Sequence, residues 1–217
     1  MGHKRPGFTL IELTLAVTIT AVTGLSIAGV MMTLSRAHQQ SQIFHQSVQA
    51  GRCVMRNVGQ TIRQAKLVTA CDDHSITLWT NDNDGNGEIN PSELAVIYYD
   101  PESRELRQVA MEMDSLSESL KAAVDQPVPL YTLTNAEYSR GYVNASAYAV
   151  TRPLAANVTS MRFFLNRYAP LTRTVGLEAD ITRGGQTLGF RTAVSTRAGF
   201  EQYVGVSDGD YVLMPIY

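Results

Sequence analysis

The N-terminal stretch, residues 4–34, reads KRPGFTLIELTLAVTITAVTGLSIAGVMMTL. Beyond its first few residues it is mostly apolar, is interrupted mainly by threonines, and carries one charged residue, Glu12. A bilayer core needs about 20 helical residues, so this stretch is long enough to cross a membrane. Lys4 and Arg5 precede it, and cationic residues beside a first hydrophobic span stay on the cytoplasmic side. We therefore expect a single-pass membrane anchor, with the N-terminus cytoplasmic and the body outside the cytoplasm.

The position of Gly7 makes the prediction more specific. A secretory signal usually has a shorter apolar segment with a small-residue cleavage site after it, whereas here the small residue comes first. Residues 4–12 resemble the prepilin cleavage and methylation signature of type IV pilins and type II secretion pseudopilins. The resemblance implies that a prepilin peptidase cuts between Gly7 and Phe8 and that the new N-terminus is methylated. The apolar helix would then remain on the mature chain, and the resemblance implies that it lies in the bacterial inner membrane with the head periplasmic or extracellular.

Glu12 has a role in this resemblance. A carboxylate inside a membrane span costs roughly a few kcal/mol and is rarely kept without a partner. In the family, the equivalent glutamate meets the N-terminal amine of a neighbouring subunit. The resemblance therefore implies an intersubunit pair of Glu12 and Phe8 inside a filament. The alternative is an ordinary signal anchor with an acid near the interface.

The sequence after Leu34 is more polar but keeps a helical rhythm. Apolar or small residues recur at alternating four- and three-residue steps, at Phe44, Val48, Gly51, Met55, Val58, Ile62 and Ala65. This spacing predicts that one helix continues from about Thr9 to about Lys66. A separate short core helix after a break is the alternative. Gly24 and Gly29 stand where many major pilins have a proline, so the sequence departs from the pattern of a major subunit.

Beyond Cys71 the sequence changes to short extended segments, several of which alternate apolar and polar residues. They are Ser75–Thr80, Leu94–Tyr99, Glu105–Ala110, Val158–Asn166, Val175–Thr182 and Gln186–Ser195. Between the two groups, residues 115–118 offer a capping box for a short helix that runs to about Val124. The run from Leu94 to Arg107 is loosely similar to the head of minor pseudopilin J.

These patterns predict an α+β fold that resembles the pilin fold, with a long N-terminal helix packed on an antiparallel β-sheet head. The expected parts are a leader (1–7), a transmembrane and assembly half of the helix (8–34), an amphipathic half (35–67) and a β-rich head (68–217).

Residues 82–93, DNDGNGEINPSE, match the spacing of the EF-hand calcium loop at every specified position. Alternate side chains turned inward can surround a hard cation with oxygens. The predicted ligands are Asp82, Asp84, Asn86, the carbonyl of Glu88 and a bidentate Glu93. The flanking segments are predicted as strands, so the loop would connect a hairpin. The alternative is a polar turn rich in Asp, Asn and Gly.

The two cysteines, Cys53 and Cys71, are too few for a disulfide scaffold and lack the CxxC arrangement of a metal cage. A chain that leaves the helix after Cys53 can fold back, so one disulfide between them is possible outside the cytoplasm. Two separately buried thiols are the alternative.

The composition favours one ordinary folded body with no electrostatic partner. The chain has 217 residues, 44% hydrophobic and 18% charged, and a formal net charge of −2. Nucleic-acid binders usually carry a basic face, so we expect no direct binding of nucleic acid. No GxSxG or HExxH motif occurs, so we expect no enzyme.

The predicted function is a minor pilin-like or pseudopilin subunit of a type II secretion or type IV pilus filament. Its expected partners are a prepilin peptidase, other pilins and the inner membrane. Secretion, piliation and DNA uptake remain open as the host system. The alternatives are a membrane-anchored calcium-dependent binding domain and an anchored hydrolase with an unrecognised site.

Overall fold

A computed structural model describes residues 9–113, 115–197, 199–207 and 209–214. The predicted processing residues, Gly7 and Phe8, lie outside the described residues. The chain forms two compact units, divided after His45.

The first helix, α1, runs from Leu10 to Gln64 without a break. The prediction of one continuous helix is therefore confirmed, and the helix ends two residues before the expected Lys66. The end has a clear cause, because the N–H of Lys66 donates to the Trp79 carbonyl at 2.8 Å. This bond begins the pairing of β1 with β2, which takes the chain out of the helix.

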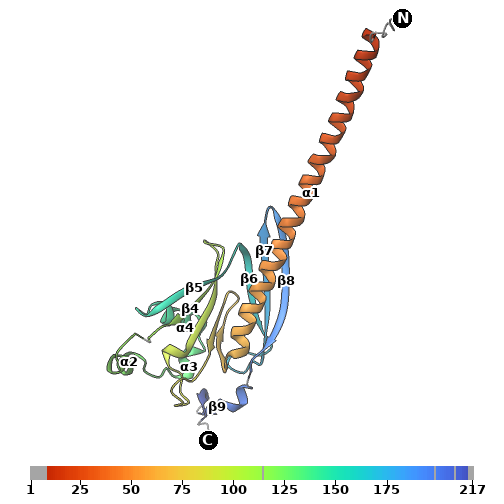
Figure 1. The fold of residues 1–217 in the computed structure, drawn as a ribbon. Coiled ribbons are helices and arrows are strands. Elements are labelled where there is room, and N and C mark those ends of the chain that lie inside the picture. The colour runs from red at the N-terminus through yellow and green to blue at the C-terminus, as the bar shows by residue number, and fades with distance from the viewer. Residues whose placement is uncertain (1–8, 114, 198, 208, 215–217) are drawn as a thin grey trace, which may run out of the picture. The chain divides into compact units, whose positions relative to one another are not determined.

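The body that follows is built from antiparallel strands and short helices (Figure 1). One sheet has five strands in the order β1 Leu67–Cys71, β2 Ser75–Trp79, β3 Leu94–Asp100, β4 Glu105–Met111 and β5 Ala149–Ala156. A second sheet has the three strands β6 Val158–Leu165, β7 Thr174–Arg183 and β8 Gln186–Ser195. The last pair is β9 Val204–Ser207 with β10 Asp210–Leu213. The short helices are η1 Pro91–Glu93, α2 Glu118–Val124, α3 Leu130–Leu133, α4 Ala136–Asn144 and η2 Phe200–Gln202.

The α+β layout and the antiparallel pairing agree with the sequence prediction, but the expectation of one sheet was wrong. The strands divide into separate sheets between β5 and β6. Asn157 stands at this division with φ 61°, a left-handed conformation that asparagine tolerates better than most residues. It turns the chain, so β6 starts a new sheet and pairs with β7.

The short helix predicted after residue 115 is present, but its start was placed too early. Ser117 is the N-cap of α2, and the helix begins at Glu118. It ends at Val124, as expected, and Pro127 and Pro129 follow shortly after it.

Two hydrophobic clusters lie in the second unit. The first joins Val54, Val58 and Ile62 of α1 to strands of both larger sheets, with Ile76 and Leu177 among its members. Along α1, the predicted stripe members Gly51, Val58 and Ile62 are buried and Met55 is partly buried, while Val54 is a buried residue that the stripe did not include. Phe44, the first predicted member, is 46% exposed.

The second cluster lies on the opposite face of the five-stranded sheet. Neighbouring residues such as Leu78 and Trp79 point to different clusters, because successive side chains of a strand alternate between faces. Leu133 of α3 and Val143 of α4 cover this second face. Strands β1 and β2 are consequently buried almost throughout.

Candidate functional site

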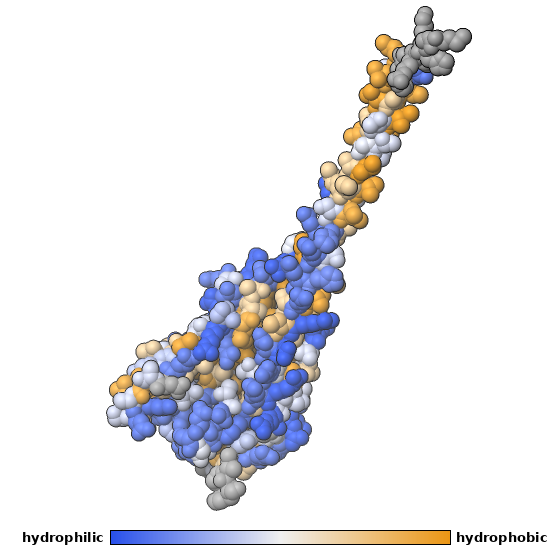
Figure 2. Space-filling view, in the orientation of Figure 1, coloured by the Kyte–Doolittle hydropathy of each residue, from blue (hydrophilic) through white to orange (hydrophobic). Residues whose placement is uncertain are grey.

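The apolar segment at the start of α1 is the first candidate site. Its large hydrophobic side chains are all more than half exposed, at Leu10, Ile11, Leu13, Leu15, Val17, Ile19, Val22, Leu25, Ile27, Val30, Met31, Met32 and Leu34. These positions fall on every side of the helix, and Figure 2 shows the hydrophobic colour over this part of α1. Among the described residues, α1 is the one helix long and apolar enough to cross a membrane. A helix that is apolar all round needs lipid or other apolar surfaces around it.

The hydroxyl groups in this segment are compatible with lipid. Each serine and threonine from Thr14 to Thr33 donates to a carbonyl three or four residues earlier on the same helix; Thr20, for example, bonds Ala16 O at 2.7 Å. Such back-bonding satisfies a donor that would otherwise be costly in hydrocarbon. The threonines therefore do not count against a membrane span.

Glu12 has a partner within its own chain. Its Oε2 accepts from the Thr9 N–H at 2.9 Å and from Thr9 Oγ1 at 2.8 Å, while the Glu12 N–H donates to Thr9 Oγ1 at 3.4 Å. This is a capping box, which satisfies N–H groups at the start of a helix. The T-x-x-E spacing of Thr9 and Glu12 in the sequence indicates such a capping box. The prediction of Glu12 as an intersubunit partner alone missed this signal. The predicted pair with Phe8 lies outside the described residues.

The loop between β2 and β3 is the second candidate site. The two strands pair antiparallel, and Trp79 lies opposite Leu94, so the loop connects a hairpin as predicted. One turn of 3-10 helix, η1, stands immediately before β3, with Asn90 as its N-cap. Gly85 and Gly87 have φ values of 70° and 73°, which glycine adopts without strain.

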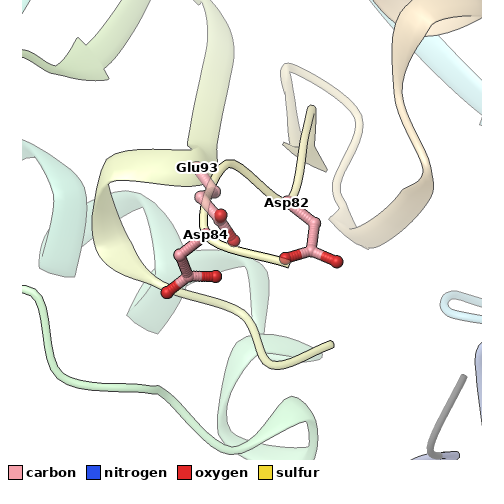
Figure 3. Close-up of side chains that lie close together, drawn as sticks. All are labelled: Asp82, Asp84 and Glu93. Atoms are coloured by element: carbon pink, nitrogen blue, oxygen red, sulfur yellow. The ribbon is translucent and has the colours of Figure 1, made fainter. Parts of the chain in front are cut away.

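Three of the predicted ligands come together in this loop. One carboxylate oxygen from each of Asp82, Asp84 and Glu93 lies within 4.8 Å of the others (Figure 3). Calcium binds oxygens at 2.3–2.6 Å, so two ligands of one ion are separated by at most about 5 Å. The spacing of the three carboxylates is therefore compatible with one calcium ion.

Glu93 is buried and held by three donors. Its Oε2 accepts from the Trp79 indole N–H at 3.0 Å and the Asn90 N–H at 3.3 Å, and its Oε1 accepts from the Asn83 N–H at 2.5 Å. Burial raises the pKa of Glu93, and these hydrogen bonds oppose the shift. Trp79, the one tryptophan of the chain, therefore touches a predicted metal ligand.

Asp82 is held by Lys66. The Lys66 Nζ lies 3.1 Å from Asp82 Oδ2 and 4.9 Å from the centre of the Trp79 ring, with the Tyr203 ring at 5.7 Å. Burial favours a raised pKa for Asp82, but the hydrogen bond and charge of Lys66 outweigh it and the pKa is lowered. The Asp82 side chain is 6% exposed. Its second oxygen, Oδ1, is buried and accepts no hydrogen bond from the described residues.

Asn90 leaves a second buried oxygen unpaired. Its Nδ2 donates to Asp84 Oδ2 at 2.8 Å, which fixes the amide orientation. In η1 the Glu93 N–H donates to the Asn90 carbonyl at 3.0 Å. Asn90 is 6% exposed, and its Oδ1 has no hydrogen-bond partner within the described part of the chain. The sequence pattern leaves this position unspecified, so Asn90 was missed.

The other two predicted ligands lie at the exposed side of the loop. Asn86 donates through Nδ2 to Asp84 Oδ2 at 2.7 Å, and its Oδ1 accepts from the Glu88 N–H at 2.6 Å. Asn86 thus orients Asp84. Glu88 is exposed, and none of its carboxylate oxygens belongs to the acidic group among the described residues.

A surface pocket opens beside this loop. Asn83, Asp84, Asn90 and Glu93 line it together with Asp125, which is one of three further acidic residues at the pocket. Asp84 and Glu93 therefore border a pocket through which an ion could reach the loop.

The predicted disulfide is absent, because Cys53 and Cys71 are both free. Cys53 lies on the exposed face of α1, next to the buried Val54, and accepts from Asn57 Nδ2 at 3.5 Å. Cys71 packs against the first hydrophobic cluster. The two thiols thus belong to different surroundings, and the fold-back of the chain after α1 does not bring them together.

Comparisons of the chain with protein-family models, curated proteins and solved structures find no match. The function is therefore argued from the sites themselves.

Proposed function

We propose that this chain is a minor pilin-like (pseudopilin) subunit of a type II secretion or type IV pilus filament. The leader is removed by a prepilin peptidase, α1 anchors the chain in the bacterial inner membrane, and the same helix later packs among the helices of other pilins. The chain acts by assembly and has no catalytic role.

The observation that carries this proposal is the exposed segment from Leu10 to Leu34, with Glu12 in its first turn and the glycine signature immediately before it. An apolar surface on every side of a helix is unfavourable in water, where burial is worth about 25 cal/mol per Å². It can be satisfied by lipid and equally by neighbouring apolar helices. A subunit that moves from membrane to filament needs a helix of this kind.

The capping box gives Glu12 a second possible role. Either its charge meets the amine of another subunit, or its main work is to cap α1. Glutamine also serves at this position of a capping box, so Glu12→Gln keeps the cap and removes the charge. Thr9→Ala does the reverse, because it removes the threonine side of the cap and keeps the charge.

The test uses the full chain expressed in cells that hold the sibling pilins, with crosslinking to those siblings as the measurement. We expect Glu12→Gln to insert in the membrane normally but to lose most of the crosslinked product. Thr9→Ala should retain most of it, because a cap is worth about 1 kcal/mol and the filament supplies other contacts. Normal crosslinking of Glu12→Gln, or its loss in Thr9→Ala alone, would contradict the intersubunit role.

A second candidate is a membrane-anchored, calcium-dependent binding domain outside any filament. The unpaired oxygens of Asp82 and Asn90 favour it, because they point to a ligand in the β2–β3 loop. It differs from the first proposal in needing no leader cleavage.

A further inference from the structure

Within the part of the chain that the structure describes, two buried oxygens of one loop, Asp82 Oδ1 and Asn90 Oδ1, accept no hydrogen bond. Leaving a buried polar group unpaired costs about 1–3 kcal/mol, so folded proteins rarely keep two of them close together without a ligand. Both residues border the same acidic group: Asp82 belongs to it, and Asn90 bonds Asp84. The two oxygens are an observation separate from the clustering of the carboxylates.

The sequence positions of these oxygens match a known coordination order. In a twelve-residue calcium loop that starts at Asp82, Asn90 stands at position 9, which contributes an oxygen directly or through water. Position 12 is Glu93, the last residue of η1, and this turn stands where the exit helix of an EF-hand would begin. Here the flanking elements are strands, so the same loop chemistry is carried by a hairpin.

We propose that residues 82–93 form a calcium site in which Asn90 Oδ1 joins Asp82 Oδ1, Asp84 and Glu93 as oxygen donors. Asn86 and the Glu88 carbonyl complete the shell at the exposed side. The site is independent of the filament role.

The contacts of the loop explain how the donors are held. Lys66 Nζ donates a hydrogen bond to Asp82 Oδ2, so Asp82 Oδ1 remains available to bind the ion. Trp79 and the Asn83 N–H fix the Glu93 carboxylate, and Asn86 fixes that of Asp84. Donors whose orientation is already fixed lose little freedom on binding. Repulsion among the carboxylates is also relieved by a divalent cation.

The position of Trp79 provides a direct assay. Its indole is one hydrogen bond from Glu93, so a luminescent lanthanide at the site should be excited through the indole. The full chain in detergent micelles is titrated with TbCl₃, and the emission is then competed with CaCl₂. We expect saturable emission that calcium removes with a dissociation constant of roughly 10⁻⁴ to 10⁻³ M, as in extracellular modules. Magnesium should compete far more weakly, because it demands a tight octahedral shell.

Three variants assign the ligands. Asp84→Asn and Asn90→Ala should each weaken calcium binding at least about tenfold, since each removes or weakens one donor of the shell. Glu118→Gln is the matched control, because Glu118 is an exposed acid that lines the pocket beside the loop and is not a proposed donor; the affinity of this variant should stay within about twofold of the wild type. Asn90→Asp restores an oxygen and should bind at least as tightly as the wild type.

Several results would overturn the site. They are the absence of terbium emission, emission that calcium does not remove, and emission that persists in Trp79→Phe. Equal weakening of calcium binding by Glu118→Gln and Asp84→Asn would mean that only the overall negative charge attracts the ion. Wild-type affinity in Asn90→Ala would remove Asn90 from the shell.

Discussion

The two halves of α1 differ in whether the folded chain buries their isoleucine side chains. Ile19 and Ile27 in the first half are 56% and 58% exposed, whereas Ile62 in the second half is fully buried. In the first half apolar residues occupy every side of the helix, and in the second they form one stripe beside exposed residues such as Arg56 and Arg63. A stripe is satisfied by the chain's own strands. The chain's own strands cannot cover a helix that is apolar on every side. The first half of α1 therefore depends on surroundings that the chain does not supply.

A matched pair of isoleucine substitutions tests whether the two halves of α1 contribute differently to the free energy of unfolding. Ile62→Ala should lower the free energy of unfolding by about 2–5 kcal/mol, because it opens a cavity in the first hydrophobic cluster. Ile19→Ala should change it by less than about 0.5 kcal/mol, as surface substitutions usually do. Denaturant unfolding of the detergent-solubilised chain, followed by Trp79 fluorescence, measures both. Equal losses would mean that the first half also supports the folded body.

A smaller expected effect is a difference in thiol reactivity between the two cysteines, which lie in different surroundings. Burial raises the pKa of the Cys71 thiol to about 12, with Asp72 and Asp73 adding to the shift. The thiolate is the reactive form, so Cys71 should react slowly with maleimide at neutral pH and faster as the pH rises toward 12. Cys53 is exposed and should react first.

In this labelling experiment Cys53→Ser should remove the fast phase, and Cys71→Ser should leave it intact. A reducing agent should not change the melting temperature. If neither thiol reacts until reductant is added, the cysteines are bonded and the arrangement of β1 on α1 is different.

Part of the fold was predictable because its signals are local. The helical spacing from Gly51 to Ile62 predicted the buried stripe, and the alternation in β7 predicted a strand with one buried face. Strand β1 was missed because it is buried on both faces and shows no alternation. Strand β5 was missed because it contains Pro153, which is tolerated there since β5 lies at the sheet edge.

The candidate calcium site likewise has one part that local sequence spacing predicts and another that depends on contacts between distant segments. Asp82, Asp84 and Glu93 follow a fixed spacing within one loop, so the sequence could predict that they meet. Lys66 lies sixteen residues before Asp82 and reaches it through the pairing of β1 with β2. Its contact with Trp79 and Tyr203 depends on the packing of distant segments, for which no sequence period exists.

The intact mass of the chain, extracted from membranes of bacteria with an active prepilin peptidase, tests the central claim most directly. The account predicts a mass that lacks residues 1–7 and carries one added methyl group, on Phe8. Gly7→Val should retain the full leader, because the bulkier residue blocks the cut, and it serves as the control for the peptidase. A wild-type mass that still contains the leader in these cells would contradict the assignment as a pilin-like subunit.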